Sequence, residues 1–282
     1  MTCLMFTPAL RRDRALKAWS YGVSSVILDL EDAVPADRKE AARAAAAALL
    51  AEVAQPWTVR INDLDSPWWR DDLAAVLQPN LACVMVPKLQ SADMICAVDD
   101  ILTRHEAQVA HQEPVRLLPI IESVQGLAAA RAIAGASGRV AALTFGEGDF
   151  SLDLGLDWDP FGTTLTFAKV QLVLDSRLAG IAPPHAGAYP HLHDAEGLAR
   201  SCDLAKSLGF GTKHCIHPEQ IPVVRRAFAP TDAAIARAEK IVARFEAALA
   251  GGSAAIDVDG VFVDYPVYRR AQQTLRDAAR PE

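Results

Sequence analysis

Pro119-Ile120-Ile121-Glu122-Ser123 is a short apolar run that ends in an acidic residue. Two other segments have a similar form, Val59-Arg60-Ile61-Asn62 and Phe145-Gly146-Glu147-Gly148-Asp149. This pattern is typical of a buried parallel strand whose carboxyl end opens into an active site. An arginine and two separated carboxylates delivered in this way predict a divalent metal site that faces an anionic substrate.

The spacing of the strand-like segments predicts the fold class. Such segments recur roughly every 25 to 30 residues, and they cover residues 3–8, 25–32, 58–62, 83–88, 116–123, 141–149, 180–184 and 211–217. Helical stretches rich in Ala, Leu, Arg and Glu lie between them, for example at 38–53, 91–111 and 126–136. Strands that alternate with helices favour parallel pairing, so we expect an α/β fold, a (β/α)8 TIM barrel. The seventh strand is the least defined, because Pro183 and Pro184 cannot donate to a sheet ladder.

The chain continues well beyond the eighth strand. We expect the barrel to occupy residues 1–230 and a C-terminal extension to occupy residues 231–282. In the extension, Gly251-Gly252-Ser253 separates a long helical stretch from a polar turn at 257–260, a strand-like run and a last helix. This order predicts a lid or an arm that packs on a neighbouring subunit.

Composition limits the classes of function. The 282 residues are 51% apolar and carry a formal net charge of -7. Such a chain can bury a large core, in one α/β barrel or in two smaller domains. The acidic balance argues against general binding of nucleic acid or of anionic membranes. No apolar run approaches the roughly 18 to 20 residues that cross a bilayer, and the N-terminus lacks the order of a signal peptide, so we expect a cytoplasmic enzyme.

The cysteines indicate a reducing environment. Their number is odd and no C-x-x-C spacing occurs among Cys3, Cys83, Cys96, Cys202 and Cys215. We therefore expect reduced thiols, and none of them as a nucleophile.

Glu122 and Asp149 are the candidate metal ligands. Both would project at the same rim of a barrel, and two hard oxygen ligands without a His-rich or Cys-rich spacing suit Mg²⁺. The alternative is that both are ordinary helix-capping acids at strand-to-helix turns. Gly146 and Gly148 favour the metal site, because they let the backbone approach a ligand closely. Glu147 is a weaker ligand candidate.

Arg60 would end the third strand, where a guanidinium can bind a carboxylate or a carbonyl oxygen that becomes an enolate. Its alternative role is an ion pair at the barrel rim with Asp29, Glu31 or Asp32. These three acids end the second strand. We expect them to support the site by holding either metal-bound waters or Arg60.

A basic segment follows the first strand. Residues 6–17 form a basic island in an acidic protein, which suits a phosphate-bearing ligand whose adenine or pantetheine portion packs against Phe6. Solvated helix charges are the alternative interpretation.

Three histidines are a second candidate for a metal site, in this case for zinc. His185, His191 and His193 lie in a loop rich in Pro and Gly, but they lack the helical spacing or cysteine partner of a zinc site. His217, which precedes Pro218, is better placed to line a pocket.

Seven segments in this order resemble the citrate lyase beta-subunit-like family, which includes malyl-CoA and citramalyl-CoA lyases. They are residues 6–17, 27–34, 59–62, 119–123, 146–150, 215–221 and 263–266. The resemblance implies a (β/α)8 barrel that forms trimers or hexamers and that makes or breaks carbon-carbon bonds beside a CoA thioester with Mg²⁺.

The resemblance also implies roles for individual residues. Glu122 and Asp149 resemble the family's metal ligands, and Arg60 resembles the residue that binds substrate oxygens. Asp264 resembles a tail aspartate that reaches a neighbouring subunit's active site as acid or base. The residues that match the CoA-contacting positions are Phe6, Arg11, Lys17, Ile216 and His217.

Three departures from the family pattern bear on the substrate. Leu10 stands where many relatives have an aspartate, Phe167-Ala168-Lys169 replaces a commoner Tyr-Ala-Arg, and residues 183–187 replace an Ile-Asp-Gly-like stretch. The expected reaction is cleavage or formation of a 3-hydroxyacyl-CoA, which would give a 2-oxo acid and an acyl-CoA. The alternatives are a class II aldolase that acts on free 2-oxo acids without CoA, and a non-catalytic or complex-bound citrate-lyase-like subunit.

Overall fold

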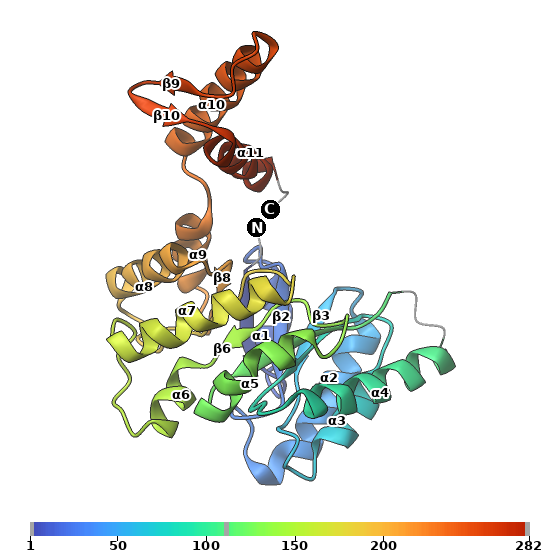
Figure 1. Ribbon diagram of the computed structural model, residues 1–282. Helices are drawn as coiled ribbons and strands as arrows, with labels where there is room; N and C mark the ends of the chain where they lie inside the picture. The colour runs from blue at the N-terminus through green and yellow to red at the C-terminus, as the bar shows by residue number, and fades with distance from the viewer. Residues whose placement is uncertain (1–2, 110–112, 280–282) are drawn as a thin grey trace. The chain divides into compact units, whose positions relative to one another are not determined.

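Eight parallel strands form one sheet in the order β1-β2-β3-β4-β5-β6-β7-β8 in the computed structural model, which describes residues 3–109 and 113–279. The chain after β8 returns to β1, because Phe6 N donates to the carbonyl of Cys215 and Cys215 N donates to the carbonyl of Leu4. The sheet is thereby a barrel with helices around it (Figure 1). The (β/α)8 prediction is confirmed.

The strands are β1 (Leu4–Pro8), β2 (Ser25–Asp29), β3 (Trp57–Arg60), β4 (Leu81–Val86), β5 (Arg116–Ile121), β6 (Thr144–Phe145), β7 (His185–Ala186) and β8 (Thr212–Lys213). The helices of this part are α1 (Arg12–Trp19), η1 (Ala36–Arg38), α2 (Lys39–Glu52), α3 (Trp69–Val76), α4 (Ala92–Val109), α5 (Val124–Gly135), α6 (Glu147–Asp153), α7 (Thr163–Leu178), α8 (Ala195–Leu208) and α9 (Gln220–Phe228).

The last strands differ from the sequence prediction. The run at 141–149 contains a strand of only two residues, β6, because the chain turns at Gly146 and α6 begins at Glu147. The predicted seventh strand at 180–184 is wrong. The strand lies at His185–Ala186, immediately after the two prolines that cannot donate to the ladder.

Every second side chain along the strands points inward, and these side chains fill the barrel interior. Its apolar cluster consists of Leu4, Ile27, Cys83, Met85, Leu118, Ile120 and Ala142, with Phe6 and Ala141 packed against it. Successive side chains of a strand point to opposite faces, so every second side chain points into the barrel. On β3 the last inward side chain is Arg60, and on β5 the inward series continues to Glu122, just after the strand ends. The apolar core therefore supports a charged mouth at the carboxyl ends of the strands.

Contacts divide the chain into two compact units, Thr2–Ala227 and a second unit from Phe228 onward. The second unit contains α10 (Asp232–Ala250), β9 (Ile256–Val258), β10 (Val261–Val263) and α11 (Tyr265–Ala279). Asp259 and Gly260 both have positive φ in the two-residue turn between β9 and β10, which is the conformation that such hairpins require. The packing of this unit on a neighbouring subunit stays a prediction.

A core of its own stabilises the second unit. Ala238, Ile241, Phe245, Val258, Val263 and Ala271 form this cluster. The ring of Phe245 stacks on Tyr268 with centroids 4.7 Å apart, which joins α10 to α11.

Among the described residues of the whole chain, no helix combines the length and apolar character that would let it cross a bilayer.

Candidate active site at the barrel mouth

Arg60 lies in an acidic pocket at the mouth. Its Nε and Nη2 donate to the two oxygens of Asp29, each at 2.7 Å. Its Nη1 lies 3.0 Å from Glu31 Oε2 and 3.2 Å from Asp32 Oδ2. Asp29 and Arg60 are register partners on β2 and β3, so their side chains project side by side into the barrel. The ion pair that we considered as the alternative role of Arg60 is therefore present.

These contacts hold the Arg60 guanidinium in one orientation. The guanidinium lies over the ring of Phe6, 5.0 Å from its centroid. Burial lowers the pKa of Arg60, but the charges of Asp29, Glu31 and Asp32 outweigh burial and raise the pKa above its ordinary value. A guanidinium has five N–H groups, and three of them donate to Asp29 and Asp32, while Nη1 also forms an ion pair with Glu31. Nη2 donates one hydrogen to Asp29, which leaves its second hydrogen for another acceptor.

Lys88 connects the arginine pocket to Glu122, and sequence reasoning missed it. Its Nζ lies 2.7 Å from Glu31 Oε1, and its backbone N–H donates to Glu122 Oε1 at 2.7 Å. Lys88 has a φ of 53°, a conformation that non-glycine residues rarely adopt and that often marks functional sites. The only signal in the sequence was its position at the end of a predicted strand.

Glu122 is a buried carboxyl group with 6% exposure. Burial, followed by the negative charges of Asp149 and Glu31, raises the pKa of Glu122 to about 8. Strand β5 pairs with β6, Gly146 lies against Glu122, and Asp149 follows in the first turn of α6, so we expect the two acids to face one site. The capping interpretation does not describe Glu122, because the cap of α5 is Ser123, whose side chain accepts from Gly126 N.

This acid pair fits a hard divalent cation. A buried carboxyl group whose pKa is raised by two neighbouring acids is stabilised in its ionised form when a cation arrives. Among the described residues, no group of three or more His, Cys, Asp or Glu side chains is arranged to hold a metal ion. Glu122 and Asp149 would supply two carboxylates, and water and substrate would supply the other ligands, as is usual for Mg²⁺.

Glu147 has a different environment from its neighbours. It is buried and lies 3.2 Å from Lys169 Nζ and 3.6 Å from Lys213 Nζ. Burial lowers the pKa of Lys169, and the carboxylate opposes this effect. Our weaker ligand candidate is therefore paired with two lysines, whose roles the sequence pattern did not reveal.

The basic segment after β1 is largely exposed. Arg11 donates to Asp13, and Lys17 Nζ lies 5.9 Å from the centroid of the Tyr21 ring. Phe6 differs from them, because it lies inside the barrel beneath Arg60. A phosphate group could replace the exposed Asp13 as the partner of Arg11, since exposed ion pairs are weak.

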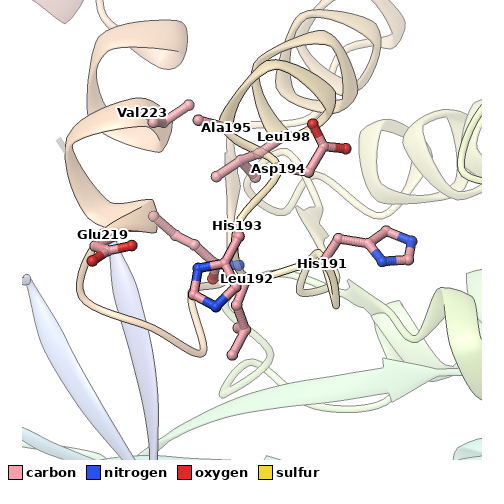
Figure 2. Close-up of a pocket in the computed structure, with 9 residues that line it drawn as sticks. His191, Leu192, His193, Asp194, Ala195, Leu198, Glu219 and Val223 are labelled. Atoms are coloured by element: carbon pink, nitrogen blue, oxygen red, sulfur yellow. The ribbon is translucent and has the colours of Figure 1, made fainter.

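A pocket of about 190 Å³ lies between the loop that carries His191 and His193 and the start of α9 (Figure 2). Its lining residues are His191, Leu192, His193, Asp194, Ala195, Leu198, Glu219, Gln220 and Val223. Gln220 joins the strip to the pocket loop, because it accepts from Ile216 N and donates to the carbonyl of Tyr189. His185 is not part of this pocket, so the structure separates it from His191 and His193.

The buried His214 forms a pair with the partly buried His185, and His185 Nδ1 lies 3.1 Å from His214 Nε2. The sequence alone indicated no role for His214.

Asp264 lies in the second unit at the start of α11, where its Oδ1 lies 3.4 Å from Val267 N. Its action in a neighbouring subunit's site stays a prediction.

Comparisons with known proteins show which proteins this chain resembles. The family model HpcH/HpaI aldolase/citrate lyase matches residues 2–218. Citrate lyase subunit beta of Leuconostoc mesenteroides subsp. cremoris is 32% identical over 279 residues, which cover 97% of this chain and 91% of that protein. L-malyl-CoA/beta-methylmalyl-CoA lyase of Cereibacter sphaeroides is 32% identical over 301 residues, which cover 98% and 94%.

Solved structures give the same result. CitE from Mycobacterium tuberculosis, in complex with magnesium, acetoacetate and coenzyme A, is 29% identical with a TM-score of 0.80, and the match covers 99% of this chain and 98% of that chain. RipC from Yersinia pestis is 33% identical with a TM-score of 0.70, and the match covers 83% and 98%.

Proposed function

The chain belongs to the HpcH/HpaI aldolase/citrate lyase family and is an enzyme of that family, and on this premise we propose that it is a Mg²⁺-dependent carbon-carbon lyase or synthase. Its substrate is a 3-hydroxyacyl-CoA of the malyl-, citramalyl- or citryl-CoA type. The products are a 2-oxo acid and an acyl-CoA.

One observation carries the proposal. Lys88 links Glu122 to the Arg60 pocket, because its N–H donates to Glu122 Oε1 and its Nζ contacts Glu31. On the other side Gly146, which precedes the helix that carries Asp149, lies against Glu122, whose pKa is raised to about 8. Burial is the main cause of this raised pKa, and Asp149 and Glu31 add to it. A site that accumulates acids around a buried carboxyl group and retains a fixed guanidinium suits an anionic substrate bound through a cation.

Glu122 and Asp149 are the residues that would hold the cation. When bound, Mg²⁺ supplies Lewis-acid polarisation of a substrate carbonyl oxygen. Lys88 N–H fixes Glu122 Oε1 by a hydrogen bond, so this carboxylate keeps its orientation through the reaction.

Arg60 binds the oxygens on which negative charge develops. Its remaining Nη2 hydrogen is fixed in direction by Asp29, so no reorganisation is needed as the enolate forms. A donor of this kind commonly contributes about 3 kcal/mol to the stabilisation of a transition state. Asp264 of a neighbouring subunit exchanges the proton on the carbon next to the thioester.

The CoA portion lies outside this centre. Arg11 and Lys17 bind its phosphates, with Phe6 at the inner end of this path and with Ile216 and His217 along the opposite strip. The related CitE structure contains coenzyme A and acetoacetate together with magnesium, which supports CoA as a ligand of this chain.

The assembly is a homotrimer or hexamer. Helix α7 exposes Phe167, Val170, Leu174 and Leu178 at helical spacing, and such an apolar stripe commonly marks a contact between subunits.

The cysteines are free thiols, which fits a reducing compartment such as the cytoplasm.

A second candidate follows from the relatives named citrate lyase subunit beta. The chain would then be one component of a complex and would act on a carrier-bound thioester. Turnover of malyl-CoA, citramalyl-CoA or citryl-CoA by the purified chain with Mg²⁺ separates the two candidates. Activity that EDTA removes supports the free lyase, whereas inactivity with all three despite tight CoA binding favours the subunit.

The class II aldolase alternative is tested by CoA itself. In the presence of Mg²⁺, CoA raises the melting temperature of a CoA-dependent enzyme, because it binds only the folded state. Cleavage of free 2-oxo acids with no response to CoA would support the aldolase instead.

A further inference from the structure

The register of β7 and β8 builds the His185–His214 pair. His185 pairs with Thr212 on β8, and His214 lies just after β8, two residues beyond Thr212, where its N–H donates to the carbonyl of Ala186. The rings are perpendicular, with centroids 5.2 Å apart. Two short strands of the barrel wall therefore hold the pair in place.

The pair adjoins the Arg60 pocket. The ring of His214 meets Phe6 edge-on with centroids 5.6 Å apart, and the Arg60 guanidinium lies over the same Phe6 ring. Burial, followed by the charges of His185, Lys213 and Arg60, lowers the pKa of His214 well below its usual value. His214 is thus a neutral hydrogen-bonding group close to the guanidinium.

One nitrogen of the pair is unsatisfied. His214 is 1% exposed, and its Nδ1 has no hydrogen-bond partner among the residues that the structure describes. A buried nitrogen in this state destabilises the native protein unless water or a bound molecule satisfies it. The position of this nitrogen beside Phe6 and Arg60 makes a substrate the reasonable partner.

The ring nitrogen that carries the proton in His185 determines which ring nitrogen carries it in His214. Burial also lowers the pKa of His185, to about 4, so both rings are neutral near pH 7. When His185 Nδ1–H donates to His214 Nε2, the single proton of His214 must lie on Nδ1. Oxo and carboxylate oxygens only accept hydrogen bonds, so this arrangement is the one that binds them.

We propose that His214, oriented by His185, donates a hydrogen bond from Nδ1 to an oxygen of the 2-oxo acid portion of the substrate. His214 is then a residue that determines substrate class, and His185 is a positioning residue that fixes the tautomer of His214. The inference rests on the proposed function, because it takes the oxo acid to bind beside Arg60.

Nitrogen NMR of the unaltered full-length protein, with ¹⁵N-labelled histidine and Mg²⁺ present, tests the inference directly. Pyruvate is the probe, and calorimetry under the same conditions establishes whether it binds. We expect the Nδ1 signal of His214 to be that of a protonated nitrogen and to move on addition of pyruvate. Binding of pyruvate with an unmoved His214 signal would overturn this inference alone. No binding of pyruvate, glyoxylate or oxaloacetate would overturn both proposals.

Variants provide an independent readout. His214→Leu should raise the KM for the 2-oxo acid about tenfold in the condensation direction, the loss expected for one hydrogen bond. The KM for the acyl-CoA should not change. His214→Asn retains a donor near the Nδ1 position and should recover most of the affinity. The control is His105→Leu in α4, where the histidine contacts the carbonyl of Leu77; equal effects of both leucine variants would indicate a purely structural role.

Discussion

Gly146 lies against Glu122 so closely that no side chain fits between them. A Cβ atom at position 146 would lie 2.5 Å from Glu122 Cβ and 2.5 Å from Glu122 Oε2. Glycine at the end of β6 therefore allows the buried carboxyl group to occupy its place at the barrel mouth. At Gly148, in contrast, an added Cβ would meet nothing within 4 Å.

Gly146→Ala should displace the Glu122 carboxylate and lower the affinity for Mg²⁺ by more than about tenfold, because metal sites tolerate little displacement of a ligand. Calorimetric titration measures this affinity. Gly148→Ala is the matched control and should bind Mg²⁺ as the unaltered protein does. Equal losses in both variants would show that the close approach at Gly146 is not the cause.

Binding of Mg²⁺ should release a proton from Glu122. Burial, with Asp149 and Glu31, raises the pKa of this group to about 8, so it is mostly protonated at pH 7 without a cation. Affinity should rise with pH and level off above about pH 8. Calorimetry in two buffers with different ionisation enthalpies counts the protons released. Binding that is independent of pH from 6 to 9 would contradict the assignment.

The raised pKa of Glu122 also makes the stability of the metal-free protein depend on pH. The pKa of Glu122 is higher in the folded protein than in the unfolded chain, so its contribution to stability is fully present below pH 4.5 and is lost as pH rises through about 8. Glu122→Gln should remove this loss and also abolish turnover that EDTA can inhibit. Chemical denaturation at several pH values measures the first effect, and unchanged lyase activity would refute the second.

Asp29→Asn should be far more harmful than Asp32→Asn. Asp29 is buried and bonds Arg60 through both oxygens, so its loss leaves a largely buried guanidinium underpaired and should destabilise the protein by about 3 to 5 kcal/mol. The Asp32 side chain is 54% exposed, and its loss should have an effect below about 1 kcal/mol. Urea unfolding compares the two variants. Similar losses would mean that Asp29 does not hold Arg60.

The histidine pair should make the protein sensitive to acid. Burial lowers the pKa of His185 to about 4 in the folded state, whereas an unfolded histidine has a pKa near 6.5. The unfolded chain thus binds more protons, and stability should fall as pH decreases from about 6.5 to 4. His185→Leu should reduce this fall. An identical pH profile for the variant would show that the pair does not contribute.

Active sites should be shared between subunits. A mixture of Arg60→Ala and Asp264→Asn chains should regain activity, because some mixed oligomers combine an intact Arg60 with an intact Asp264 from a neighbour. The assay follows turnover after subunit exchange, which mass spectrometry of differently labelled chains verifies. Absence of activity in mixtures with confirmed exchange would contradict the shared site.

The sequence predicted the barrel because strand-like runs alternate with helical stretches, and this pattern is local. It predicted Arg60 and Glu122 as strand-end residues for the same reason. The position of β7 was wrong by a few residues, because two prolines delayed the strand until His185 and the remaining pairing is only two residues long.

Other features could not be predicted because they depend on contacts between distant elements. Lys169 and Lys213 surround Glu147 only after α6, α7 and β8 are assembled. The role of Lys88 depends on its backbone conformation, and that of His214 depends on the register of β8 against β7. No spacing along the sequence encodes these relationships.

The central claim is that Glu122 and Asp149 hold one divalent cation in front of Arg60. Anomalous diffraction from crystals grown with Mn²⁺ and pyruvate tests it most directly, because Mn²⁺ accepts the same oxygen ligands as Mg²⁺. We expect one strong peak in contact with both carboxylates, with pyruvate between it and Arg60. A peak elsewhere, or full occupancy that survives Glu122→Gln with Asp149→Asn, would contradict it.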